Sequence, residues 1–175
     1  AVIGAYFRLQ YFVYTVVYGL GNAVVPIIAF NCGARSRARV EGTVRVALLT
    51  ALISMCAGMM LLLLIPEQLL ALFSMSPEAI AIGAPALRIT GTSFVAAGIC
   101  LVYSYTFQAI GSNSFSLIMA LLRQIVILLP LVALLAQVSL SLSWWAFPIT
   151  EWSCCVLTMV LYRNAHQKRI VPLEG

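Results

Sequence analysis

The sequence has 175 residues, of which 63% are hydrophobic and 9% are charged, and its formal net charge is +5. Soluble domains carry about 25% charged residues, and a chain of about 150 residues buries only about 70% of the surface that it exposes when unfolded. The composition therefore excludes an ordinary soluble domain. The basic residues lie between apolar segments rather than on one face, which argues against a nucleic-acid-binding protein.

Charge-free runs of residues predict an all-α integral membrane protein, a bundle of about five transmembrane helices. A helix needs about 20 apolar residues to cross the hydrocarbon core of a bilayer. By that criterion we predict spans at residues 9–34, 46–66, 80–110, 115–137 and 144–162, an interfacial helix at about 67–73 and a tail at 163–175. The chain begins with Ala1, already inside an apolar stretch, so we expect it to be part of a longer protein.

The first span contains Gly19-Leu20-Gly21-Asn22 and, shortly after it, Pro26. Glycine and proline inside a span free backbone groups, which a membrane tolerates only where protein or water satisfies them, so we expect this helix to be interrupted near its middle. Broken helices of this kind mark solute-binding sites. The helical periodicity places one polar-aromatic face along the span, formed by Tyr11, Thr15, Tyr18, Asn22 and Pro26. Close packing of small residues against a neighbouring helix is the alternative explanation.

Ser76-Pro77-Glu78 precedes the third span and predicts the start of a helix, with serine at the N-cap and proline at the first helical position. One stripe along this span consists of Thr90, Ser93, Ala97, Ser104 and Gln108. Helix packing is the favoured explanation of such small residues, and Gln108 is the best candidate in the stripe for contact with a solute. Arg88 and Arg123 are assigned to span ends, from which their side chains reach the interface.

Glu151 lies about a third of the way along the last span. The periodicity puts it on one face with Trp144, Phe147, Pro148, Cys154, Cys155 and Thr158, opposite an apolar face of Trp145, Ile149, Val156 and Val160. A carboxylate inside a membrane costs several kcal/mol unless it is protonated or paired, so Glu151 is a candidate functional group. The alternative is a hydrated carboxylate near the outer interface.

The basic residues predict the orientation of the spans. Eight of the ten Lys and Arg residues fall on the side of the first connection, the third connection and the carboxyl terminus, namely Arg35, Arg37, Arg39, Arg45, Arg123, Arg163, Lys168 and Arg169. Arg8 and Arg88 fall on the other side. Basic loops are typical of the cytoplasmic face, so we expect the loop at residues 35–45 and the carboxyl terminus in the cytoplasm.

The residues that catalysis and metal binding need are scarce. The single histidine, His166, lies in the basic tail, where we expect it to be solvated, and the sequence has no aspartate. The five cysteines form no C-x-x-C pair, and we interpret them as small buried residues rather than as disulfide partners or metal ligands. No nucleotide-binding loop is recognisable. The sequence therefore indicates a solute pathway, without a metal site and without enzymatic activity.

Taken in order, these motifs resemble the carboxyl-terminal lobe of the multidrug and toxic compound extrusion (MATE) family. Residues 18–26 and 31–35 resemble the eighth helix of that family and the loop after it. Other parts of the chain resemble the start of the tenth helix (residues 70–73, 76–78 and 87–89), its end (107–111), the eleventh helix (Arg123-Gln124 with Pro130) and the start of the twelfth (145–151). The resemblance covers nearly the whole chain.

The resemblance implies that residues 1–175 are part of the carboxyl-terminal lobe of a twelve-helix transporter, in which two six-helix lobes face each other across a central cavity. It implies secondary active multidrug or organic-cation efflux by proton- or sodium-coupled antiport across the plasma membrane of a bacterium, with this segment inactive alone. The expected partners are small amphipathic or cationic solutes, the lipid bilayer and the missing amino-terminal lobe. Neither a nucleic acid nor any cofactor besides the coupling ion is expected.

The candidate residues for the solute and ion pathway are Glu151, Asn22, Gln108, Tyr18, Pro26 and Pro148. Some branches of the family carry an aspartate in the tenth helix, and since this chain has none, Glu151 is left as the candidate coupling group. We expect its protonation to repack the last span against the first. The alternatives are a lipid-linked saccharide flippase of the same broad architecture and a structural membrane subunit that transports nothing.

Overall fold

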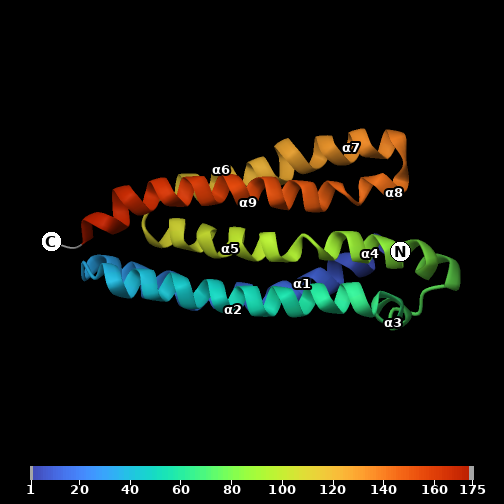
Figure 1. Ribbon diagram of the computed structural model, residues 1–175, viewed down its shortest axis with the longest axis horizontal. Helices are drawn as coiled ribbons and strands as arrows, with labels where there is room; N and C mark the ends of the chain where they lie inside the picture. The colour runs from blue at the N-terminus through green and yellow to red at the C-terminus, as the bar shows by residue number, and fades with distance from the viewer. Residues whose placement is uncertain (1, 174–175) are drawn as a thin grey trace.

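The computed structural model describes residues 2–173, and the regular elements in that range are all helices (Figure 1). The α-helices are α1 (Val2–Gly33), α2 (Arg37–Leu64), α3 (Pro66–Ala71), α4 (Pro77–Gly91), α5 (Phe94–Ala109), α6 (Asn113–Leu121), α7 (Leu129–Val138), α8 (Leu140–Ser143) and α9 (Ala146–Ala165). Two segments, η1 (Leu122–Leu128) and η2 (His166–Ile170), are π-helical, and η3 (Val171–Leu173) is a 3₁₀ turn.

The long helices lie side by side along one axis, with their connections at the two ends of the molecule (Figure 1). The α1–α2 turn, the α5–α6 turn and the η2–η3 segment lie at one end, and α3 and α8 lie at the other. Four helical segments are each long and apolar enough to span a membrane, and α4 with α5 forms a bent fifth span. The predicted fold class, an all-α membrane bundle of about five spans, is confirmed.

Helix α1 runs without interruption from Val2 to Gly33, with Pro26 inside it, so the expected break near its middle is wrong. Gly21 has a packing role instead. A Cβ atom at Gly21 would lie 2.4 Å from the ring of Tyr105, so only glycine lets α1 approach α5 this closely. Pro26 costs one backbone hydrogen bond, and the helix continues past it.

The predicted span at residues 80–110 consists of two helices, α4 and α5, which meet at an angle of 46°. The hydroxyl of Thr92 donates to the carbonyl oxygen of Ile89 at 2.7 Å, and the hydroxyl of Ser93 donates to that of Thr90 at 2.6 Å. Such side-chain bonds to carbonyls of the preceding turn compete with the helical ladder and bend helices. The start of α4 is as predicted, with the Ser76 hydroxyl accepting from the backbone N–H of Ala79 at 3.3 Å.

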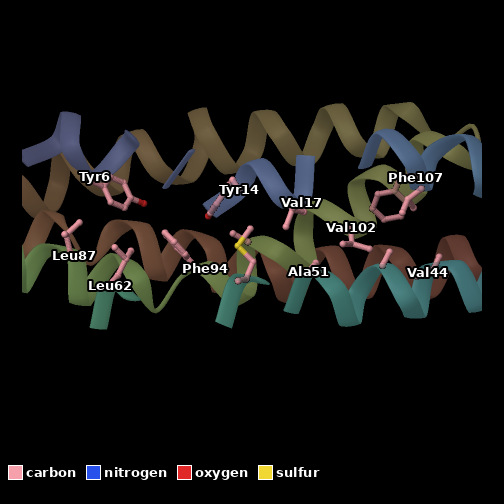
Figure 2. Packing of buried hydrophobic residues seen from close by; sticks show 14 of the residues in the cluster. Tyr6, Tyr14, Val17, Val44, Ala51, Leu62, Leu87, Phe94, Val102 and Phe107 are labelled. Carbon is pink, nitrogen blue, oxygen red and sulfur yellow. The ribbon is translucent and has the colours of Figure 1, made fainter. Parts of the chain in front are cut away.

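The core runs the length of the bundle between α1, α2, α4 and α5 (Figure 2). Its large buried side chains include Tyr6, Tyr14, Val17, Val44, Leu62, Leu87, Phe94, Val102 and Phe107. The outward faces of α2 and α9 are apolar, as shown by the exposed residues Val46, Leu49, Ile53, Trp145, Ile149, Val156 and Val160. These two faces therefore suit contact with lipid, as the periodicity of the last span predicts.

His166 of the carboxyl-terminal segment contacts the bundle, so the expectation that this residue is solvated is wrong. His166 Nε2 lies 2.8 Å from Glu41 Oε1 of α2, and Ile170 is fully buried. The chain remains helical through η2, where Ala165 just before it and Ile170 at its end are buried. Residues 174 and 175 of the predicted tail lie outside the described residues.

Two glycines of α2 allow a test of this packing. Alanine is intrinsically more stable than glycine in a helix by about 1 kcal/mol. A Cβ atom at Gly42 meets open space, whereas one at Gly58 would lie 2.3 Å from Val13 of α1. We therefore expect G42A to raise the thermal stability of the purified protein and G58A to lower the free energy of unfolding by about 1–3 kcal/mol. Equal effects of the two substitutions would contradict the α1–α2 contact.

Candidate functional site

Arg123 of η1 and Glu151 of α9 form an ion pair inside the bundle. Their Nη1 and Oε2 atoms are 3.4 Å apart, and the two side chains are 27% and 12% exposed. Glu151 therefore lies within the bundle and is paired. Each charge alone would cost several kcal/mol in this environment, and pairing offsets part of that cost.

The assignment of Arg123 to a span end is wrong. Arg123 lies ten residues after Asn113, where α6 begins, in a helical segment that continues to Val138. Ten residues of helix rise about 15 Å, which is half of the roughly 30 Å hydrocarbon core. Because the helix begins directly after the turn at Gly111, the guanidinium is placed in the middle of the span rather than at its end.

Arg123 lies in the π-helical segment η1, which ends just before Pro130. Proline lacks a backbone N–H, and a π-helical segment changes the direction in which the side chains of the following turns point. π-Helical segments occur frequently at functional sites. Here the irregular segment carries the only arginine of its span, so the departure from α-helical geometry coincides with the buried charge.

Three tyrosines of α1 lie in the neighbourhood of the ion pair. Tyr6, Tyr14 and Tyr18 each lie close enough to interact electrostatically with both Arg123 and Glu151. Tyr6 and Tyr14 are buried in the core (Figure 2). The site is therefore built from three elements that are distant in sequence, namely α1, η1 and α9.

Three buried hydroxyls at this site lack partners. The hydroxyls of Tyr6 and Tyr14 and Oγ1 of Thr150 make no hydrogen bond with any residue that the structure describes. Thr150 directly precedes Glu151, and the Tyr6 ring packs against Phe147, with the ring centroids 5.3 Å apart. Buried polar groups are almost always hydrogen-bonded to protein or to ordered water. The neighbourhood of the carboxylate is therefore suited to a water molecule or to a polar solute.

A pocket of about 310 Å³ adjoins the ion pair and lies between α5, α6, η1 and α9. Its walls are formed by Cys100, Leu101, Ser104, Phe107, Met119, Ala120, Arg123, Gln124, Cys154 and Thr158. Among these described lining residues, only Arg123 carries a charge. The volume is at the lower end of the range for small-molecule sites, and the walls are mostly apolar with one charged group. These properties suit a small amphipathic solute.

Some of the predicted pathway residues lie near the ion pair, and others lie away from it. Pro148 is buried on the same face of α9 as Glu151, and Tyr18 interacts with the ion pair. Gln108 is exposed and donates to the Ser116 hydroxyl at 3.1 Å, so it bridges α5 and α6 near the α5–α6 turn. Asn22 and Pro26 are exposed on α1, and no described contact joins them to the ion pair.

The sequence reasoning missed Arg123, Tyr6 and Tyr14 as parts of the site. For Arg123 a signal was present, because the predicted span at residues 115–137 begins eight residues before the arginine and so leaves it well inside that span. For the two tyrosines no such signal exists, since their approach to Glu151 depends on how α1 packs against α9.

The MatE family model matches residues 1–134 of the chain. The chain belongs to the MatE family. The resemblance to MATE transporters on which the sequence analysis relied is thereby confirmed. The multidrug export protein MepA of Staphylococcus haemolyticus is 29% identical over 171 residues, which are 98% of this chain and 38% of that protein. MepA of Staphylococcus aureus strain MRSA252 is 26% identical over 161 residues.

Solved MATE structures share the fold. The MATE multidrug transporter DinF-BH, solved in complex with a ligand, superposes with a TM-score of 0.86 at 34% identity, covering 97% of this chain and 38% of that one. A MOP superfamily transporter from Pyrococcus furiosus gives a TM-score of 0.88 at 22% identity, which supports the fold alone. The chain thus spans about two fifths of the length of the relatives that it matches.

A double-mutant cycle tests the ion pair. Neutralising one partner leaves the other charge buried and unpaired, so we expect R123Q and E151Q each to destabilise the protein by about 3 kcal/mol. The double substitution R123Q/E151Q should recover about 1–3 kcal/mol of the summed loss, because both charges are then absent. Thermal unfolding of the purified protein in detergent measures all four species. Strictly additive losses would show that Arg123 and Glu151 do not interact.

Proposed function

We propose that the protein to which this chain belongs exports small amphipathic or cationic solutes by proton- or sodium-coupled antiport, and that this segment supplies part of one lobe. The observation that carries the proposal is the Arg123–Glu151 ion pair beside a 310 Å³ pocket in a MatE-family bundle. Relatives support the solute class, because MepA is named a multidrug export protein and DinF-BH is named a multidrug transporter.

Glu151 is the group that would bind the coupling proton. When its carboxylate is ionised, it compensates the charge of Arg123, which lines the pocket. When the carboxylate is protonated, the guanidinium charge is uncompensated and repels a cationic solute in the pocket. Binding of the proton and binding of the cation then oppose each other, and this mutual exclusion is the thermodynamic requirement of exchange.

The same protonation would loosen α9 from η1. The ion pair is one of the polar contacts between these two elements, and on its other side α9 approaches α1 through Tyr6 and Phe147. A neutral Glu151 would allow α9 to repack toward α1, as expected from the sequence. The unpartnered hydroxyls of Tyr6 and Thr150 provide positions where water could deliver the proton to the carboxylate.

The distribution of charge supports an orientation for the lobe in the plasma membrane of a bacterium. With Arg123 removed from the count, seven of the remaining basic residues lie at the end that holds the α1–α2 turn and the carboxyl terminus, and Arg8 and Arg88 lie elsewhere. We infer that the end of the bundle that holds the α1–α2 turn is cytoplasmic.

The lipid-linked saccharide flippase is the less favoured alternative. A pyrophosphate group would need several basic side chains facing the pocket, and the pocket offers Arg123, whose charge is already compensated by Glu151. A structural subunit would need no charged group in the middle of a span, because such a group is costly to bury.

Efflux of a fluorescent organic cation from cells that carry the full-length gene tests the proposed function. We expect efflux to stop when one ion gradient is collapsed, and collapsing the proton and sodium gradients separately identifies the coupling ion. Efflux that persists without either gradient, or no efflux under any condition, would contradict antiport and would favour the flippase or the structural subunit.

The substitution E151Q tests the role of the carboxylate. Glutamine keeps the shape and removes the titratable group, so we expect pH-driven efflux to fall at least about tenfold while the protein still reaches the membrane. E67Q is the matched control, because Glu67 also pairs with an arginine, Arg88 at 2.8 Å, but lies 46% exposed at one end of the bundle. Unchanged efflux by E151Q would eliminate Glu151 as the coupling group.

A further inference from the structure

A groove at the basic end of the bundle is separate from the ion pair and its pocket. It has a volume of about 460 Å³, and its lining comprises Glu41, Val44, Arg45, Leu48, Leu49, Tyr103, Tyr162 and His166. A smaller hollow of about 220 Å³, lined by Tyr162, Arg163, His166 and Gln167, shares two of these residues and continues it. We call the two together the α2–α9 groove.

The α2–α9 groove lies at the boundary between hydrocarbon and headgroups. Arg45 is the last charged residue before the charge-free run at residues 46–66, which is long enough to cross the hydrocarbon core. On α9 the apolar run ends at Tyr162, and Arg163 follows. Tyrosine and arginine at such positions are typical of the membrane interface. One end of the groove is therefore polar, and the other end extends into the hydrocarbon.

The polar end of the groove carries unpaired positive charge. Arg45 and Arg163 are exposed, and none of the described carboxylates lies within ion-pair distance of either. Glu41 is the one acidic residue in the lining, and its charge is already engaged, because it accepts from Arg37 at 2.7 Å and lies 2.8 Å from His166 Nε2. An anion at this end would meet the guanidinium of Arg45 in the larger hollow and that of Arg163 in the adjoining smaller one.

The apolar end of the groove has the shape and chemistry of a lipid-facing surface. Leu48 and Leu49 of α2 form one wall, and Tyr103 and Tyr162 stack on each other opposite them, with ring centroids 4.2 Å apart. Leu49 is 54% exposed and belongs to the apolar outward face of α2, which continues to Ile53. An acyl chain can follow this face directly from the groove.

We propose that the α2–α9 groove binds one anionic phospholipid, with its phosphate at Arg45 and Arg163 and an acyl chain along Leu48 and Leu49. The combination of unpaired cations, an aromatic pair at headgroup level and an apolar continuation into the hydrocarbon favours a lipid over a soluble anion. Basic pockets between transmembrane helices are known to bind anionic headgroups. The site does not use the pocket at Arg123 and does not depend on the proposed function.

The charge requirement is tested on the full-length protein in detergent, by native mass spectrometry during titration with phosphatidylglycerol and, separately, phosphatidylcholine. R45Q/R163Q removes both cations. It should lower the affinity for the first bound phosphatidylglycerol molecule by about 30-fold and leave the affinity for phosphatidylcholine unchanged. R39Q/K168Q removes the same charge from the same end outside the groove and should change the affinity by about threefold or less. Equal losses in the two double variants would overturn the proposal.

The shape requirement is tested with substitutions that keep the charge. In L49W the indole occupies the apolar end of the groove, so we expect the first phosphatidylglycerol molecule to bind at least about tenfold more weakly. L134W adds the same side chain to an exposed leucine of α7, outside the groove, and should bind the lipid normally. Normal binding by L49W, or displacement of the lipid by millimolar glycerol 3-phosphate, would show that the groove holds no acyl chain and would overturn the proposal.

Discussion

The cost of burying a charge in the membrane is the constraint on which the site depends. Glu151 and Arg123 lie 3.4 Å apart on neighbouring elements, and each offsets part of the cost of burying the other. The pair links η1 to α9. It also places one compensated cation in the wall of a pocket, so that a single proton can change the charge which a solute meets.

Much of the fold could be predicted because the bilayer imposes simple rules on sequence. The charge-free runs predicted an all-α bundle of about five spans, and Ser76 and Pro77 marked the start of α4 correctly. The prediction for α1 was wrong because a glycine in a span can either interrupt the helix or allow close contact with a neighbouring helix. Gly21 permits close contact with Tyr105 rather than a break in the helix, and only the neighbouring helix distinguishes these roles. The bend at Thr92 depends on hydroxyl bonds that no periodicity reveals.

The residues of the site that share a face of one helix could be predicted, but the contacts between residues of different helices could not. The 3.6-residue period put Pro148 on the face of Glu151, and the structure places both residues inside the bundle. The partner of Glu151 is Arg123, which lies 28 residues earlier in the chain. The sequence pattern placed Arg123 at a span end, near the membrane interface. Buried tyrosines of α1 complete the site, and their position depends on interhelical packing, which a single sequence does not encode in any local pattern.

Continuity of α1 determines how a change at the ion pair would reach the exposed side of the bundle. The Tyr14 ring packs against Phe94 in the core and lies 6.1 Å from the Tyr18 ring, which in turn lies 6.1 Å from Tyr11 on the exposed face. The three tyrosines are fixed to one unbroken helix, α1, so they move together. If Glu151 is the coupling group, its protonation would be expressed as a shift of α1 against α9 as rigid bodies, because α1 has no unwound segment to absorb the change. A continuous helix with an exposed polar-aromatic face is therefore better suited to moving a cavity wall than to coordinating an ion through its own backbone.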